Sequence, residues 1–245
     1  MPFIVVLVVW QVATSQEWLP RYALPSPASV VEKGTKLTLN GTLIVHVRDS
    51  LFRMLVGTVV GIGLGLPLGI AIGLNRYVAG FFEPIITFFQ SIAGIAWVPL
   101  AVLWFGFGLG SIAFVVGNSV FFMVLAGAVL GVEQVPLVLR HAVRTVGGSP
   151  WRVVTDVIFP GALPSIVTGT RSGISFGWRA LIAAEIIGSK TGLGLMIWDA
   201  HLFFKSDEII LGILLIGLIW IAIDRLVLRP IEIRTVERWG TLRTG

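Results

Sequence analysis

The sequence predicts an all-α membrane protein that crosses the bilayer six times as a single domain over residues 1–245. Of its 245 residues 56% are hydrophobic and only 13% are charged, whereas about 25% of the residues of an average soluble domain are charged. Apolar runs that can cross a hydrocarbon core of about 30 Å recur along the chain, and most arginines gather in a few of the segments between them. The chain contains no cysteine, which excludes a disulfide framework and a thiolate metal site.

The six apolar runs are residues 2–19, 51–74, 84–105, 112–130, 162–187 and 208–228. The first is short and depends on Trp10 and Trp18 to reach the membrane interfaces. It lacks the basic start and the small-residue cleavage site of a signal peptide. The prolines of residues 22–27 restrict their own backbone and that of their predecessors, so we expect no regular structure there.

Five glycines in the second run recur every four residues and therefore lie on one face of the expected helix. They are Gly57, Gly61, Gly65, Gly69 and Gly73. A face without side chains allows a neighbouring helix to approach closely in a membrane. We expect helix packing on this face, and the lining of a pore is the alternative. Pro67 predicts a kink.

Short polar or glycine-rich segments separate the other runs. Arg76 and Glu83 mark a polar turn before the third run, which Pro99 interrupts. Gly106–Gly110 forms a tight turn before the fourth run. A polar segment, residues 188–207, precedes the sixth run, and a basic tail follows that run.

A polar and basic segment, residues 133–160, lies between the fourth and fifth runs. A proline opens a predicted helix over 137–146, and the pair Gly147-Gly148 ends it in the left-handed conformation. A second helix has Ser149 as its N-cap and a proline at its first position, and it runs to about residue 158. At about 1.5 Å per residue neither helix can cross a bilayer, so both lie outside the hydrocarbon.

The basic residues set the expected orientation. Those in 75–83, in 133–160 and after residue 228 fall on one side when six spans are counted, together with the N-terminus. The positive-inside rule makes this side cytoplasmic. The loops that follow the first and fifth spans are then outside, where acidic residues accompany the lysines.

The segment 133–160 resembles the cytoplasmic coupling loop in the permeases of bacterial ABC importers. The signature of that family is Glu-Ala-Ala, three residues, Gly, nine residues, Ile, one residue and Leu-Pro. The matching positions here are His141-Ala142-Val143, Gly147, Val157 and Phe159-Pro160. The glycine and proline spacing is intact, and His141 departs from the acidic residue of the signature.

Further motifs resemble the nitrate, sulfonate and taurine branch of these permeases. They are Trp97-Val98-Pro99-Leu100, Leu103-Trp104-Phe105-Gly106, Ala183-Ala184-Glu185, Gly192-Leu193-Gly194 and Ile197-Trp198-Asp199-Ala200. The resemblance implies a type I importer permease fold and a homodimer in the bacterial inner membrane. It also implies two cytoplasmic ATPase subunits and a periplasmic or lipoprotein solute-binding protein. The implied function is alternating access for a small anionic solute, sulfonate or taurine first and nitrate or bicarbonate next, with a vitamin precursor as the alternative.

The resemblance further implies which residues meet the ATPase. The expected coupling residues are Arg140, His141, Ala142, Arg144, Gly147, Trp151, Arg152 and Pro160. Aromatic and arginine side chains are typical interface anchors. The alternative for the arginines is simple positive-inside charge at the lipid headgroups.

Ionisable residues inside a span are costly and are functional candidates by default. Arg179 and Glu185 lie in the fifth run, and with Ser175 and Trp178 they are the expected lining of the translocation path. Arg179 would attract an anionic solute. A pair between Arg179 and Glu185, within one chain or across the dimer, is the alternative. Arg171 lies near the end of the run, where it can reach the headgroups.

No pattern of catalytic residues is present. The three histidines are scattered, and Gly188-Ser189-Lys190-Thr191 lacks the glycines of a P-loop. We therefore expect no enzyme activity and no cofactor, with ATP and magnesium on the partner ATPase. A soluble basic face for nucleic acid is also missing, so lipids are the expected surroundings. A self-contained secondary transporter or channel is the second hypothesis, and a membrane-embedded enzyme is the third.

Overall fold

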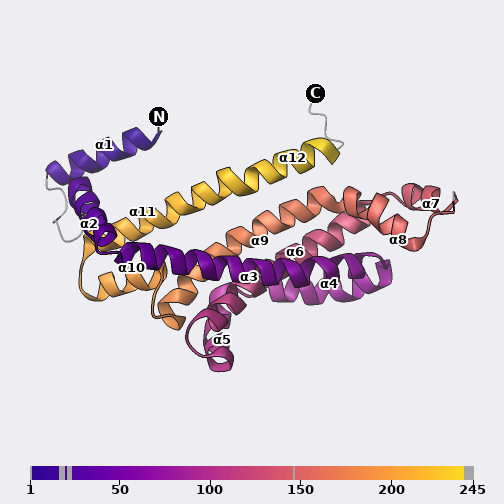
Figure 1. Cartoon of the computed structure of the whole chain (residues 1–245), viewed down its shortest axis with the longest axis horizontal. Coiled ribbons are helices and arrows are strands. Elements are labelled where there is room, and N and C mark those ends of the chain that lie inside the picture. Colours follow the sequence, from indigo (N-terminus) through magenta and orange to yellow (C-terminus); the bar gives the residue numbers. More distant parts are fainter. Residues whose placement is uncertain (1, 17–19, 21–23, 146, 240–245) are drawn as a thin grey trace.

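The computed structural model describes residues 2–16, 20, 24–145 and 147–239, and within these ranges the chain is helical and contains no strand. Its centre is a bundle of three long helices, α3 (Thr42–Gly73), α6 (Leu109–Gln134) and α9 (Phe159–Gly188). A fourth, α11 (Ser206–Ile223), runs along this bundle and continues through a π-helical turn, η3 (Asp224–Leu228), into α12 (Arg229–Trp239) (Figure 1).

The glycine face of α3 packs directly on α6. A Cβ atom built on Gly57, Gly61 or Gly69 would lie 2.6 to 2.7 Å from atoms of α6. At Gly65 it would lie 2.7 Å from the carbonyl oxygen of Phe121, which cannot move without moving the helix. The packing interpretation of this face is therefore the one that the structure supports.

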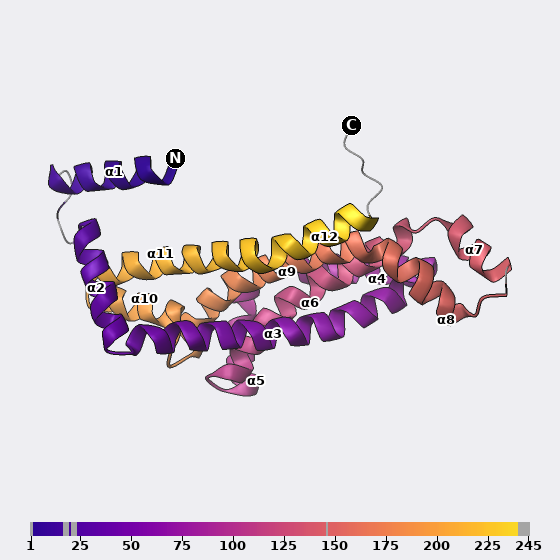
Figure 2. The same cartoon turned by 45° about the horizontal axis from the view of Figure 1, so that its top comes forward.

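A second close contact joins α6 to α9. A Cβ atom on Gly127 would lie 2.8 Å from the carbonyl oxygen of Ser165, and one on Gly169 would lie 2.8 Å from that of Met123. Small residues on both helices thus let the two backbones approach, as is common for helices in a membrane. The result is a central layer in which α6 lies between α3 and α9 (Figure 2).

The expected count of six spans is not matched by the described residues. Four helical stretches are long and apolar enough to cross a membrane, and a bent pair of helices would make five. The predicted first span, 2–19, is not among them, because α1 (Pro2–Ser15) has only 14 residues, about 21 Å of helix. Residues 17–19 of that prediction lie outside the described residues. In both views α1 stands apart from the bundle (Figures 1 and 2).

The predicted polar turn at Arg76 and Glu83 is wrong, since both residues lie in a helix, α4 (Arg76–Ser91). The side chain of Asn75 caps this helix by accepting from the Tyr77 N–H, and Pro84 lies inside it. The helix ends only at Ser91, and Ile92 and Ala93 follow it in a non-helical conformation.

The third predicted span is a broken one. After Ile92 and Ala93 the chain enters a short 3-10 turn, η1 (Gly94–Trp97), followed by α5 (Val98–Phe105). The two halves are bent by 88° relative to each other. Pro99 lies in the first turn of α5, where its missing N–H costs nothing, so the proline starts the second half and does not itself form the break.

Two further helices lie at the end of the bundle where α3 begins. Within the predicted polar segment 188–207 the structure has α10 (Leu193–Leu202), and Leu193 is fully buried. Before α3 the structure has α2 (Pro27–Leu39), which starts at the N-cap Ser26. The Ser-Pro pair that starts α2 is the same signal that predicts a helix start at Ser149-Pro150.

Candidate functional site

The predicted coupling segment, residues 133–160, protrudes beyond the bundle at the end opposite α2 and α10 (Figure 1). It contains α7 (Leu137–Thr145) and α8 (Pro150–Val153). Gly147 follows α7 with φ +80°, its N–H donates to the Arg144 carbonyl, and the Gly148 N–H donates to the Val143 carbonyl. These two bonds are those of a Schellman motif, which requires a left-handed residue at the position of Gly147. The predicted helix stop is confirmed.

The second short helix does not end where the sequence predicts. A π-helical turn, η2 (Val154–Ile158), connects α8 to α9, so residues 150–188 form one continuous helical stretch. Pro160 lies in the first turn of α9. A proline cannot donate to the carbonyl four residues before it, so the wider turn keeps the chain helical where a regular α-turn would clash. The segment is therefore joined to α9 without a loop.

Most of the expected coupling residues are open to solvent in this chain. His141, Ala142, Arg144, Gly147 and Arg152 are exposed, and Trp151 is 73% exposed. Arg140 differs from them, because its guanidinium donates to the carbonyl of Val132 in the last turns of α6. A cation at that position also interacts favourably with the helix C-terminus. Arg140 thus fixes α7 to α6, whatever else it contacts.

Arg179 lies on the rim of a cavity of about 420 Å³ at the α4–α5 break. The cavity is lined by the end of α4, the break itself, the middle of α6 and α9. Arg179 is exposed, and its guanidinium carbon lies 5.5 Å from the centre of the Phe176 ring. Among the described residues no carboxylate pairs with Arg179.

The other expected path residues lie differently. Ser175 is half-buried and lines a neighbouring hollow of about 460 Å³ between α9 and α11, which Arg179 also borders. Trp178 is buried at 4% exposure in the core cluster of α3, α6 and α9. Its indole N–H has no hydrogen-bond partner in the described part of the chain. We find no contact between Trp178 and the cavity.

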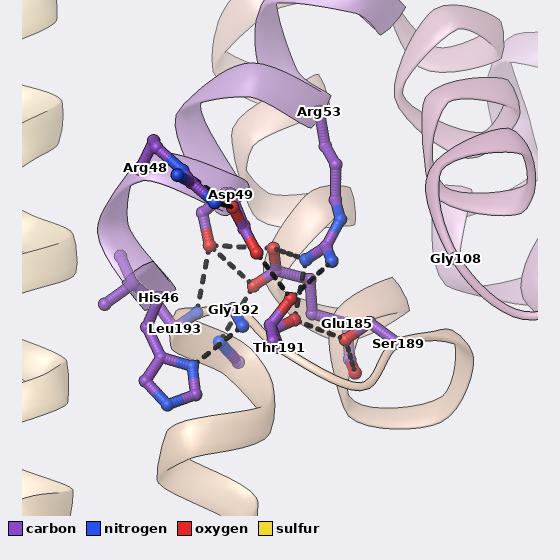
Figure 3. Close-up of polar contacts among 12 residues, drawn as sticks. His46, Arg48, Asp49, Arg53, Gly108, Glu185, Ser189, Thr191, Gly192 and Leu193 are labelled. Carbon is purple, nitrogen blue, oxygen red and sulfur yellow. Dashed lines mark hydrogen bonds and ion pairs between the residues drawn. The ribbon is translucent and has the colours of Figure 1, made fainter. Parts of the chain in front are cut away.

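Glu185 is fully buried and forms an ion pair with Arg53 of α3, with 2.9 Å between Oε1 and Nη1 (Figure 3). The same carboxylate accepts from the hydroxyl of Ser50, at 2.7 and 2.9 Å, and from the backbone N–H of Gly194, at 3.0 Å. The pairing of Arg179 with Glu185, which the sequence left open, does not occur within the described chain.

The loop that resembles a P-loop completes this cluster. Arg53 donates to the carbonyl and to the hydroxyl of Thr191, at 2.6 and 2.8 Å, and the Thr191 hydroxyl donates to Asp49. The Gly192 N–H donates to Nδ1 of His46 at 2.9 Å (Figure 3). Side chains of α3 thus hydrogen-bond to the backbone of this loop, at the Thr191 carbonyl and the Gly192 N–H.

Sequence reasoning missed Arg53, Ser50 and His46. The available signal was an arginine inside an apolar run, which is costly unless it is paired. This signal indicates that Arg53 requires a partner. It does not identify Glu185 as that partner, because Glu185 lies far from Arg53 in the sequence. A charged side chain in the middle of α9 follows the same rule: Arg171 pairs with Asp224, at 2.8 Å, and with Glu232.

No group of three or more His, Asp and Glu side chains that could hold a metal ion occurs in the described ranges. Two other features of the described chain are the cavity and the exposed α7–α8 segment. The cavity is bordered by Arg179, which has no carboxylate partner among the described residues, and the segment protrudes from the bundle.

Curated proteins similar to this chain are transport permeases and not enzymes. The taurine transport system permease protein TauC of Escherichia coli is 36% identical over 98% of this chain and 88% of its own length. The putative aliphatic sulfonates transport permease protein SsuC of Bacillus subtilis is 30% identical over 98% of this chain and 87% of its own. The nitrate import permease protein NrtB of Synechocystis is 32% identical over 91% of this chain and 83% of its own.

The fold is also found among solved structures. A chain of the MetNI methionine ABC transporter, in an inward-facing conformation, superposes with a TM-score of 0.62 over 78% of this chain and 96% of its own, at 21% identity. The family model described as the binding-protein-dependent transport system inner membrane component matches residues 61–228, which include α6, the coupling segment and α9. On this match and the three relatives, the chain belongs to the family of binding-protein-dependent transport system inner membrane components.

Proposed function

We propose that this chain is the permease subunit of an ATP-driven importer and forms the path for a small anionic solute. Sulfonates, including taurine, come first, and nitrate or bicarbonate come next. The names of the three relatives support this range, since they refer to taurine, aliphatic sulfonates and nitrate. Arg179 on α9 borders a cavity and has no carboxylate partner in the described chain, which is consistent with a solute of negative charge.

The observation that carries the proposal is the protruding coupling segment. Its two short helices present Leu137 and Val138, at 65% and 76% exposure, together with Trp151. Apolar side chains at such exposure, next to Arg144 and Arg152, are what a protein partner can cover. The partner we propose is a cytoplasmic ATPase subunit, two of them for a dimer of this chain.

The connections of the segment suit a lever. Arg140 ties α7 to the end of α6, and η2 continues α8 into α9 without a loop. A displacement of α7 and α8 by the ATPase is then transmitted to the two helices that border the cavity. This is how ATP-driven closure of the partner would exchange inward-open and outward-open arrangements.

The remaining partners follow from the same reasoning. Among the described residues the P-loop-like stretch is held by Arg53, and we propose that the nucleotide binds to the partner ATPase. A second copy of the chain would cover the exposed face around Arg179, and a periplasmic or lipoprotein solute-binding protein would deliver the solute. We propose an inner-membrane location with the coupling segment and the C-terminus in the cytoplasm, as the gathering of arginines there favours.

The test is reconstitution. The chain alone in liposomes should neither hydrolyse ATP nor accumulate taurine, and adding its partner ATPase and solute-binding protein should give ATP-dependent uptake. Accumulation by the chain alone would instead support the self-contained transporter.

Gly147→Val makes the test specific for coupling. A β-branched residue is strained at φ +80°, at a cost of about 1–3 kcal/mol, and the strain falls on the turn that orients α7. We expect the variant to insert normally and to lose most ATP-dependent uptake. Gly41→Val is the matched control, because Gly41 has φ +74°, equally open surroundings and a place at the opposite end of the bundle. Equal uptake by the two variants would argue against a coupling role for the turn.

A further inference from the structure

We infer that the cavity at the α4–α5 break is a binding site in the permease itself for a monoanionic organosulfonate, with Arg179 and Asn118 at the head and aromatic rings around the tail. The inference rests on the proposed transport function and adds a site, a ligand class and the residues that select it. A permease without such a site would leave selection to the solute-binding protein alone.

The first observation is a set of polar groups without partners. Arg179 faces the cavity without a carboxylate partner, and Asn118 on α6 makes no hydrogen bond within the described chain. Gln90 on α4 uses its amide N–H₂ on the carbonyl of Phe122, at 2.9 Å, which leaves its amide oxygen available. A guanidinium offers two parallel donors to oxyanions such as sulfonate, and an amide can add a third.

The second observation is independent of side chains. Ile92 and Ala93 separate α4 from the η1–α5 segment, two halves that together are apolar enough for a membrane span, and both residues line the cavity. Non-helical backbone within a span is tolerated only where it is buried in protein or borders water. The break and the free guanidinium therefore indicate the same thing, a wet space between α4, α6 and α9.

The break is also held in place by close contacts. A Cβ atom on Gly94 would lie 2.8 Å from the Ala180 Cβ and 2.8 Å from the Ser119 hydroxyl. The chain can pass this closely between α6 and α9 only with glycine at that position. Gly94, Ser119 and Ala180 all line the cavity, so this contact limits its size.

The walls distinguish between anions. The rings of Phe89 and Phe122 stack with centroids 5.1 Å apart, and Phe176 adjoins Arg179. A cavity of about 420 Å³ with such rings is larger and more apolar than a bare nitrate requires, whereas it suits a short aliphatic chain on a sulfonate head. None of the residues that line it is Asp or Glu, so a cationic solute would find no counter-charge.

The experiment measures binding by the purified full-length chain in detergent, without ATPase or binding protein, so that its outcome does not depend on coupled transport. Three probes are titrated calorimetrically: butane-1-sulfonate, nitrate and butylammonium. The first and third share a tail and differ in the sign of the head. We expect butane-1-sulfonate to bind in the millimolar range or tighter, nitrate to bind more weakly, and butylammonium not to bind.

Variants then locate the site. Arg179→Gln should weaken butane-1-sulfonate binding by about tenfold or more, as expected for loss of a charge-assisted contact. Asn118→Ala should weaken it about two- to tenfold. Lys190→Gln is the control, because it removes one exposed positive charge away from the cavity, and it should leave binding unchanged. Tryptophan-monitored unfolding confirms that each variant is folded.

Three results would overturn the site. They are preferential binding of butylammonium, absence of butane-1-sulfonate binding by the folded chain, and unchanged affinity in folded Arg179→Gln. None of these three results would contradict the proposed importer function. That function would be refuted separately if a reconstituted complex accumulated solute without ATP. A complex that imports a cation by ATP hydrolysis would retain the importer function but refute both the anionic solute and the site.

Discussion

The Arg53–Glu185 pair allows a quantitative prediction about what holds the chain together at the α2–α10 end. Glu185 is fully enclosed and its carboxylate accepts from Ser50, Arg53 and the Gly194 N–H. Replacing it by alanine leaves the guanidinium of Arg53, 9% exposed, with the Thr191 oxygens but without a counter-ion. Removing one partner of a buried ion pair typically costs about 3–5 kcal/mol.

The matched variants separate the pair from its surroundings. Arg53→Met keeps an unbranched, mostly aliphatic side chain and removes the charge, and we expect a loss of about 3 kcal/mol or more because Glu185 is left unpaired. The double variant Arg53→Met with Glu185→Met removes both charges. A well-packed apolar pair can replace a buried ion pair at little cost. The loss of unfolding free energy in the double variant should therefore be less than half of the summed losses of Arg53→Met and Glu185→Met measured singly.

The assay is denaturant unfolding of the purified chain in detergent, followed by the fluorescence of its tryptophans, with the free energy of unfolding as the readout. A loss below about 1 kcal/mol for Glu185→Ala would refute the reasoning, since it would place the carboxylate among weakly coupled surface charges. So would a double variant that loses the full sum, because independent sites add. Either result would return Glu185 to the candidates for the translocation path.

Two further predictions use the same assay. Gly65→Ala should destabilise the chain by about 1–3 kcal/mol, because its Cβ would lie 2.7 Å from the Phe121 carbonyl oxygen; Gly63→Ala, on the exposed face with nothing within 4 Å, should be neutral or stabilising by up to about 1 kcal/mol, and equal losses would contradict the packing interpretation. Arg171→Gln should lower stability by only about 0.5–1 kcal/mol, since its side chain is 36% exposed and its pair with Asp224 is screened by solvent; a loss as large as that of Glu185→Ala would contradict this ranking.

Features that depend on local chemistry could be predicted from the sequence. The four-residue spacing of glycines predicts a packing face because helical periodicity alone puts them in line. Gly147 predicts the end of α7 because a left-handed position favours glycine whatever surrounds it. The apolar runs give α6 and α9 with ends within about four residues of the observed ones, whereas α3 begins nine residues before its predicted start at residue 51.

Features that depend on distant parts of the chain could not. The break at Ile92 is set by how closely Gly94 approaches α6 and α9, and no local pattern reports that distance. One face of α10 is buried because it packs on α9 and α11. The sequence alone shows only a short apolar run between polar residues, which resembles a loop. Arg53, the partner of Glu185, lies on α3. The length and hydropathy of the apolar run that contains Arg53 do not indicate that it pairs with Glu185.

The charges along α9 give the strongest reason to look for a ligand at Arg179. Arg171 in the middle of the helix is neutralised by Asp224 and Glu232, and Glu185 near its end is neutralised by Arg53. Arg179 lies between them, and the described chain supplies it with an aromatic ring and no carboxylate. An unpaired arginine at membrane depth costs at least about 2.5 kcal/mol on insertion scales. A chain that satisfies the two outer charges by contacts with distant helices could satisfy the third in the same way. That it does not, where the helix borders a cavity, favours a negative charge that comes from outside the chain.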